Sequence, residues 1–194
     1  MGSKNKRKKV LKQRGYQKKV LGNKIEATKR ALLSKIIKWD DPVLKTPAKE
    51  VDNLKGNQAV ARDIIEVLEA TEDGVGMAAN QIGSLHRVFV TRPEFPEKKK
   101  AKVFINPKIS YYSDEKETAK EGCLSYPEHY CEIERSAEVI VDYTDIDGKK
   151  QTDKFDGWHA RIIQHEYDHL DGKCLVGDDY FASKKKDQKQ LATS

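Results

Sequence analysis

Apolar residues recur at helical spacing in the first third of the chain. Between about residues 57 and 71, they stand at positions i, i+4, i+7 and i+8, as Val60, Ile64, Val67 and Leu68. This spacing predicts an amphipathic helix with one buried face. We expect Asn57 to be its N-cap, and Gly74 follows its end.

A second helical pattern lies near the C-terminal end. Asp156 is the expected N-cap and Gly172 stands just past the last turn. At about 1.5 Å per residue, its roughly fifteen residues are enough to cross a small core. One stripe of this helix carries Trp158, Ile162, His165 and His169. We therefore expect a half-buried helix whose polar positions face a cleft.

Short runs of β-branched and aromatic residues predict strands between the two helices. They cover residues 87–91, 102–105, 136–145 and 151–155, with residues 108–113 starting a further strand after Pro107 ends the second run. Asp147-Gly148 is a hairpin turn signal. No repeated β-α-β pattern is present, so we predict an α+β fold with antiparallel β-sheets packed around the last helix.

Length and composition limit the class of protein. The chain has 194 residues, 37% hydrophobic and 35% charged, which is enough for one well-buried domain. No apolar run approaches the roughly 18 residues of a membrane span, and the N-terminus lacks a secretory apolar segment. Three cysteines make no disulfide framework. We expect a cytoplasmic protein with no membrane contact.

Positive charge is concentrated at the N-terminus. Residues 1–30 contain twelve Lys or Arg and one acid, giving +11, which leaves −5 for the rest of a chain whose net charge is +6. We predict a basic, flexible arm over 1–34, a catalytic domain over 35–181 and a polar tail over 182–194. A solvated tail, contact with RNA or the ribosome, and a transit peptide are the open interpretations of the arm.

The candidate chemistry lies on the second helix, in the motif Gln164-His165-Glu166-Tyr167-Asp168-His169-Leu170. On a helix, His165 and His169 leave the same face and can bind one metal ion. Glu166 lies within reach of a water at that ion. The alternative is a chance match, in which both histidines are core residues.

A third metal ligand decides between these interpretations. No His or Glu follows His169, so a downstream ligand would have to be an aspartate such as Asp171 or Asp178, which would indicate a metallopeptidase. Cys123, upstream, is the more natural candidate. A thiolate with two imidazoles and one open position is a good catalytic arrangement.

Three motifs in this order resemble those of the peptide deformylase family. They are Gly74-Val75-Gly76-Met77-Ala78-Ala79-Asn80-Gln81, Glu121-Gly122-Cys123-Leu124-Ser125 and the histidine motif above. The resemblance covers about residues 36–178. It implies hydrolysis of the formyl group on N-formylmethionyl nascent peptides.

The resemblance also implies a role for each site residue. Cys123, His165 and His169 would hold one divalent ion, Fe(II) in the cell, with zinc, nickel or cobalt as replacements. Glu166 would transfer the proton from water to the leaving amine, and Gln81 and the Leu124 N–H would stabilise the oxyanion. The residues expected to bind substrate are Val75, Gly76, Gly122 and Ile162. Glu121 is expected to orient a ligand. An RNA-binding protein with a degenerate enzyme core is the remaining alternative.

Overall fold

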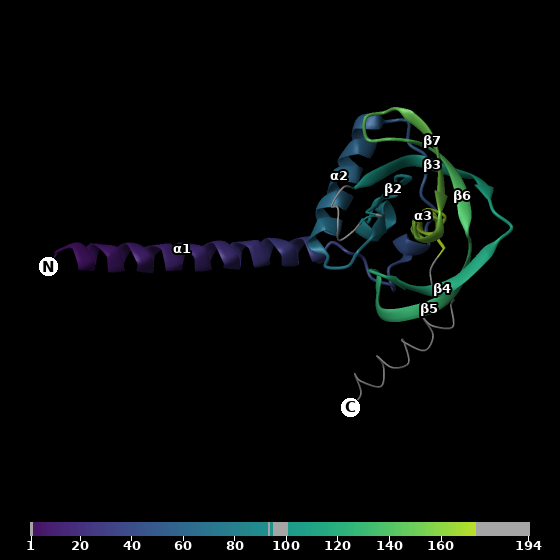
Figure 1. Ribbon diagram of the computed structural model, residues 1–194. Helices are drawn as coiled ribbons and strands as arrows, with labels where there is room; N and C mark the ends of the chain where they lie inside the picture. Colours follow the sequence, from purple (N-terminus) through teal and green to yellow (C-terminus); the bar gives the residue numbers. More distant parts are fainter. Residues whose placement is uncertain (1, 93, 95–100, 174–194) are drawn as a thin grey trace, which may run out of the picture. The chain divides into compact units, whose positions relative to one another are not determined.

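The chain has two compact units, Met1–Lys35 and Ile36–Ser194 (Figure 1). The computed structural model describes residues 2–92, 94 and 101–173, with side chains from residue 17 onward. The predicted polar tail over 182–194 and the end of the predicted catalytic domain lie outside the described residues, as do Cys174 and Asp178.

The first unit contains one helix, α1 (Gly2–Leu33). The sequence predicts a flexible arm in which a helix forms transiently or on a partner, and the structure has one continuous helix of 32 residues here. Its many Lys, Arg, Gln, Leu and Ala residues have high helix propensity, and no proline interrupts it. Val20, Leu21 and Ile25 are about half exposed, so the described part has no buried face. None of the described helices has the length and apolar character needed to cross a membrane.

The second unit is built on antiparallel sheets, which confirms the predicted α+β class. A five-stranded sheet has the order β1 (Gly76–Ala78), β2 (Val88–Thr91), β3 (Lys102–Tyr112), β6 (Glu138–Thr144) and β7 (Lys150–Asp156). A separate two-stranded sheet pairs β4 (Lys116–Cys123) with β5 (Tyr126–Ser136). Strand β1 is at the edge of the large sheet and pairs only with β2 among the described strands.

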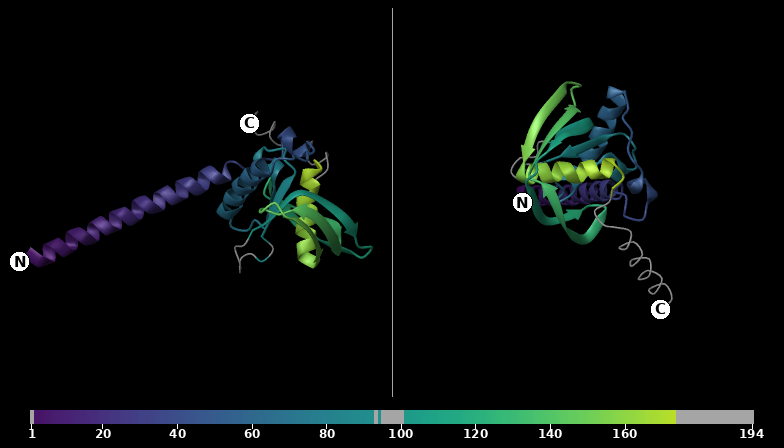
Figure 2. Two further views of the ribbon diagram at one scale, coloured as in Figure 1. Left: turned by 90° about the horizontal axis from the view of Figure 1, so that it is seen from above. Right: turned by 90° about the vertical axis from the view of Figure 1, so that its right-hand side faces the viewer.

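Helix α3 (Gly157–Leu170) lies between the five-stranded sheet and the β4–β5 hairpin (Figures 1 and 2). Its residues Ala160, Ile163 and Leu170 are buried against Phe89 and Phe104 of the sheet. The predicted N-cap Asp156 precedes the helix but makes no side-chain capping hydrogen bond. Gly172 follows the helix with φ +70°, a backbone conformation that favours glycine.

Three details differ from the sequence predictions. Helix α2 (Leu54–Ala70) is capped by Asn53, whose side chain accepts a hydrogen bond from the Gly56 N–H, while Asn57 is buried and donates to the Val51 carbonyl. Strand β3 continues through Pro107. The register shifts between Ile105 and Lys108, so Pro107, which has no backbone N–H to donate, lies in a bulge. Trp158 is 53% exposed and does not extend the buried stripe of α3.

The described part of the second unit also contains two short 3-10 helices. They are η1 (Pro42–Lys45), capped by the Asp41 side chain, and η2 (Ala79–Ile82), which ends at Gly83 with φ +83°. Helix η2 directly follows β1, so the chain turns sharply within the glycine-containing motif of residues 74–81. Gln81 belongs to this turn, and its position is therefore fixed by both β1 and η2.

Candidate metal centre

Three predicted ligands from two elements come together in the structure. His165 and His169 lie one turn apart on α3, and Cys123 is the last residue of β4. One donor atom from each lies within 4.8 Å of the others, and the Cys123 Sγ is 3.2 Å from the His169 Nε2. Cys123 and His165 are 42 positions apart in the sequence. The packing of the β4–β5 hairpin on α3 brings them together in space.

The charges in this cluster favour a bound cation. Burial raises the pKa of the Cys123 thiol, but His169 and His165 lower it more, and the resulting pKa is well below the usual thiol value. Burial lowers the pKa of His165, while Cys123 and Glu121 raise it well above the usual imidazole value. The lowered thiol pKa favours the thiolate, which is the form of cysteine that binds a divalent cation.

The donor set fits a divalent metal ion. A thiolate with two imidazoles suits zinc and several first-row transition metals. Beside these donors, the Glu166 side chain is buried, and its Oε2 has no hydrogen-bond partner among the described residues. A buried carboxylate oxygen without a partner is costly, and a nearby cation or a water that it holds reduces that cost.

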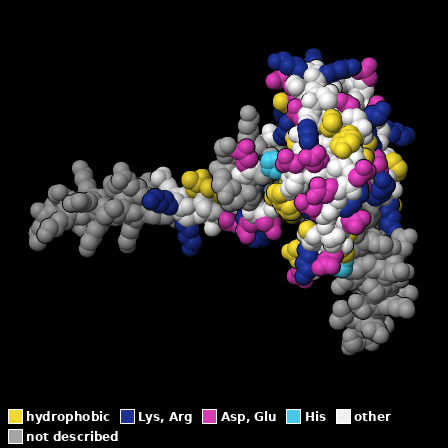
Figure 3. Space-filling model, turned by 45° about the vertical axis from the view of Figure 1, so that its right-hand side comes forward, with side chains coloured by type: hydrophobic (Ala, Val, Ile, Leu, Met, Phe, Trp, Pro, Cys, Tyr) yellow, Lys and Arg dark blue, Asp and Glu magenta, His cyan; other side chains and the backbone are white. Residues whose placement is uncertain are grey.

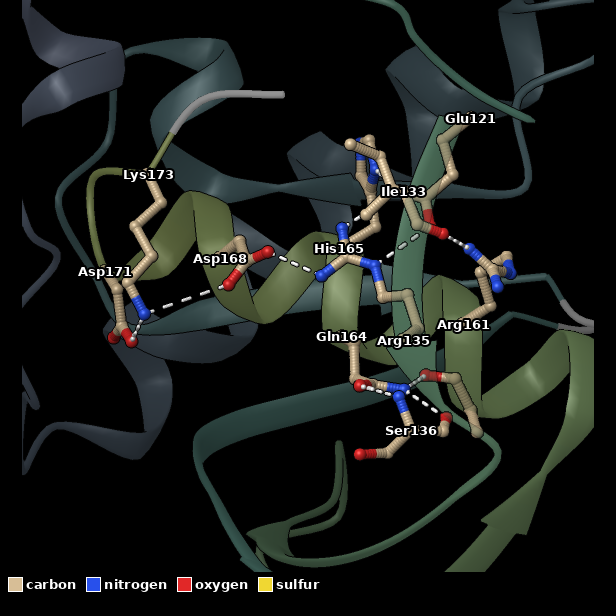
Figure 4. A network of polar contacts seen from close by, with 11 residues as sticks. Glu121, Ile133, Arg135, Ser136, Arg161, Gln164, His165, Asp168, Asp171 and Lys173 are labelled. Atoms are coloured by element: carbon tan, nitrogen blue, oxygen red, sulfur yellow. Dashed lines mark hydrogen bonds and ion pairs between the residues drawn. The ribbon is translucent and has the colours of Figure 1, made fainter. Parts of the chain in front are cut away.

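Glu121 orients one of the two histidines. Its Oε2 lies 3.0 Å from the His165 Nδ1, which leaves the His165 Nε2 for the metal. Arg135 donates two hydrogen bonds of 2.9 Å to the same carboxylate, and Arg161 donates a third of 2.7 Å (Figure 4). Burial raises the pKa of Glu121, but Arg135 and His165 outweigh it and lower the pKa to about 2. The carboxylate therefore stays ionised.

Two arginines hold Glu121, and the sequence patterns do not predict this contact. Arg135 is on β5, and Arg161 is on α3, 40 positions after Glu121. Arg135 also contacts Asp168 at 2.5 Å, and Asp168 is next to the predicted ligand His169 in the chain (Figure 4). The two contacts with Glu121 join residues 14 and 40 positions apart, so no local sequence pattern marks them.

The Gln81 side chain points into the same cluster. Its Oε1 accepts a hydrogen bond of 2.8 Å from the Ala78 N–H, which fixes the orientation of the amide. The Nε2 then lies 3.4 Å from the Cys123 Sγ and 3.2 Å from the Ser125 Oγ. Leu124 follows Cys123 in the turn between β4 and β5. The predicted oxyanion donors thus come from η2 and from this turn.

Glu166 lies against β1. A Cβ atom added to Gly76 would be 2.4 Å from the Glu166 Oε1, so only glycine fits at this position with the present arrangement. Burial raises the pKa of Glu166 to about 7, and the imidazoles of His165 and His169 oppose this increase. The edge strand and the predicted proton carrier are therefore in direct contact.

The other predicted substrate-binding residues are spread around this cluster. Val75 is partly exposed, and its carbonyl accepts a hydrogen bond from the Arg92 N–H. Gly122 is exposed, and a Cβ there would be 2.7 Å from the Tyr130 ring. Ile162 is buried and lines a small pocket between α3 and the large sheet, with Thr91, Lys102, Phe155, His159 and Ile163.

The alternative downstream ligand does not join the cluster. The Oδ1 of Asp171 forms an ion pair of 2.9 Å with Arg87, and its Oδ2 lies 3.5 Å from the Lys173 Nζ. The group of potential ligands contains Cys123 and not Asp171. Cys131, the other described free cysteine, instead lies 3.2 Å from His129.

Comparison with known proteins identifies the family. The family model for polypeptide deformylase matches residues 33–187. The chain belongs to the polypeptide deformylase family. This result confirms the predicted family and its activity class: these enzymes are metal-dependent hydrolases that remove the N-formyl group from nascent peptides.

Individual deformylases resemble the chain over most of its length. The peptide deformylase of Pseudothermotoga lettingae is 42% identical over 146 residues, which cover 75% of this chain and 82% of that relative. The crystal structure of peptide deformylase from Thermotoga maritima is 38% identical with a TM-score of 0.67, covering 72% of this chain and 92% of that one. A probable deformylase from Synechococcus phage S-SSM7 is 36% identical with a TM-score of 0.68, covering 73% and 96% respectively.

Proposed function

We propose that this deformylase hydrolyses the formyl group of N-terminal formylmethionine on newly made peptides and releases formate, with Cys123, His165 and His169 as its metal ligands. The observation that carries the proposal is the convergence of these three donors within 4.8 Å, beside a buried glutamate. The Glu121 contact with His165 supports the same ligand set.

Fe(II) is the ion that we propose for the enzyme in the cell, with zinc, nickel and cobalt as functional substitutes. One thiolate and two imidazoles accept each of these ions, and availability decides among such metals as much as affinity. When bound, the ion supplies Lewis-acid polarisation of the formyl carbonyl and makes a water more acidic.

Glu166 is the proposed proton carrier. Its carboxylate is buried, and its Oε2 has no partner among the described residues, so the oxygen is free to accept a proton from the attacking water. The same group then gives the proton to the departing amine. Hydrolysis is complete when formate and the free N-terminal amine leave.

Gln81 and the Leu124 N–H are the proposed oxyanion donors. The Gln81 amide is held at both ends, by the Ala78 N–H at its oxygen and by Ser125 near its nitrogen. A donor that is fixed in this way needs little reorganisation when negative charge develops on the formyl oxygen.

Val75, Gly76, Gly122 and Ile162 are the proposed substrate-binding residues. The edge position of β1 among the described strands supports this assignment, because an extended peptide can add to an edge strand through backbone hydrogen bonds. A peptide paired there would run next to Glu166, which contacts Gly76. Apolar side chains such as Val75 and Ile162 would then contact the methionine.

We further propose that the basic α1 arm contacts RNA, including the ribosome. Residues 1–30 carry +11, while the remainder carries −5, and acidic side chains are spread over the face of the second unit in Figure 3. Lys and Arg along a helix bind phosphate groups with release of counterions, so RNA retention should fall steeply with salt and should require residues 1–30. We assign the enzyme to the cytoplasm, where its free thiols Cys123 and Cys131 would remain reduced.

A formate-release assay tests the proposed function. Protein kept without air and supplied with Fe(II) is given a formyl-Met peptide, and both formate and internal cleavage products are measured. We expect stoichiometric formate with an intact peptide. Cleavage of internal bonds without formate would indicate a metallopeptidase instead.

A further inference from the structure

Three consecutive residues connect the two motifs that supply the oxyanion donors. They are Ile37, Lys38 and Trp39, which we call the strap, and they follow the first residue of the second unit. No motif in the sequence marks them. Their contacts are made to η2 on one side and to the turn after β4 on the other.

Each residue of the strap makes one hydrogen bond to this region. The Ile37 N–H donates to the Gln81 carbonyl at 2.8 Å, and the Trp39 N–H donates to the Ser125 carbonyl at 3.1 Å. Between them, the Lys38 Nζ donates to the Leu124 carbonyl at 3.0 Å. The strap therefore bonds to Gln81 itself and to both residues of the turn that carries Leu124.

An aromatic contact holds the strap in place. Trp39 packs against Tyr126, which is 1% exposed, and Cys123 packs against the same tyrosine. Tyr126 begins β5 directly after the turn. The strap is thus attached to the metal-binding hairpin by packing as well as by hydrogen bonds.

The two donor elements need such a connection. Helix η2 has four residues, and the turn has two residues between β4 and β5. The Gln81 Nε2 contacts this turn region through the Cys123 Sγ at 3.4 Å and the Ser125 Oγ at 3.2 Å, but neither contact involves Leu124. Oxyanion donors work only when they are held within about 0.5 Å of the productive geometry.

We propose that the strap sets the distance between the Gln81 side chain and the Leu124 N–H, and that Lys38 is a positioning residue for deformylation. This inference rests on the proposed roles of Gln81 and Leu124. Lys38 acts through the Leu124 carbonyl and does not bind substrate. Its loss should therefore lower kcat and leave KM and the metal affinity unchanged.

The first test is kinetic. We expect Lys38→Met to lower kcat about three- to ten-fold with KM unchanged, because one hydrogen bond from a charged group is lost. Lys38→Arg keeps a donor and should restore most of kcat. Lys55→Met, on the exposed face of α2, is the matched control and should resemble the wild type. In a Gln81→Ala background, Lys38→Met should have a smaller effect, because both changes act on one unit.

The second test does not depend on activity. Hydrogen–deuterium exchange should become faster over residues 122–127 in Lys38→Met and stay unchanged over α2. An unchanged exchange pattern, an unchanged kcat, a rise in KM alone, or loss of the metal would each overturn the proposal for Lys38. If the wild type releases no formate, the proposed function fails, and the exchange experiment still decides whether Lys38 holds the turn.

Discussion

The Glu121 Oε2 lies 3.0 Å from the Nδ1 of His165, and the same carboxylate accepts three hydrogen bonds from Arg135 and Arg161. Glu121 stands two residues before Cys123, a proposed metal ligand. One short stretch of β4 therefore carries a proposed ligand and also orients a second proposed ligand, His165 of α3. The arginines keep the carboxylate charged, so its bond to the imidazole is maintained.

Replacing Glu121 should weaken metal binding. In Glu121→Gln, the charged acceptor for the His165 Nδ1 is lost, and we expect the metal affinity to fall about 10- to 100-fold. Competition with a chromogenic chelator measures this change. Glu132→Gln, at an exposed position of β5, is the control and should keep wild-type affinity. Wild-type affinity in Glu121→Gln would show that the contact does not support the site.

Gly76 should not tolerate a side chain. A Cβ at this position would lie 2.4 Å from the Glu166 Oε1, so Gly76→Ala must displace the glutamate or strand β1. We expect a loss of kcat of about 100-fold or more, since misplacement of a reacting group by 1 Å has that effect. The bound metal should remain. Gly22→Ala, where a Cβ meets nothing within 4 Å, should be fully active; equal activity of the two variants would contradict the predicted role of this contact.

Cys123 and Cys131 should differ in their effects on the metal. Cys123→Ala removes a donor and should abolish both metal retention and formate release, whereas Cys131→Ala should retain both. The two free thiols pack near the same Tyr126 ring, so they are well matched. Metal analysis after gel filtration distinguishes them. Retention of one equivalent by Cys123→Ala would favour a different third ligand.

Much of this arrangement was predictable, and the rest depends on long-range packing. The periodicity around His165 and His169 predicted α3, because their spacing repeats each helical turn. Hairpin β4–β5 was missed because most residues of β4 are exposed, and no apolar alternation marks it. The strap was missed because two of its three hydrogen bonds come from backbone groups, which every residue type carries.

Some local sequence patterns fit more than one structure. Asn53 and Asn57 both suit an N-cap, and the structure selects Asn53 because Asn57 is buried with a hydrogen bond to the Val51 carbonyl. Pro107 predicts the end of a strand, but a bulge in β3 accommodates this residue. Such choices are decided by tertiary contacts that the sequence does not display.

Acid should weaken the sheet through Asp153. This carboxylate accepts hydrogen bonds from Lys102 and Tyr143, and those contacts lower its pKa in the folded protein. A lowered folded-state pKa stabilises the protein above the ordinary Asp pKa of about 3.9, and the stabilisation is lost as the pH falls below that value. We expect Asp153→Asn to lower the free energy of unfolding at pH 7 by a small amount and to have almost no effect near pH 2.

Urea unfolding at both pH values measures this difference. Lys154→Gln is a control for general charge effects. Lys154 is the next residue after Asp153, and it forms an ion pair with Glu138 at the surface. An Asp153→Asn penalty that is the same at pH 7 and at pH 2 would contradict the electrostatic explanation and would point to lost packing instead.

We propose that Glu166 carries the proton at a metal site built from Cys123, His165 and His169. Formate release and metal content, measured together in Glu166→Ala prepared without air and loaded with Fe(II), test this role. We predict one equivalent of metal with formate release from a formyl-Met peptide reduced about 10³-fold or more, since general acid–base catalysis typically supplies about 10²- to 10⁴-fold. Wild-type formate release by the metal-loaded variant would contradict the mechanism.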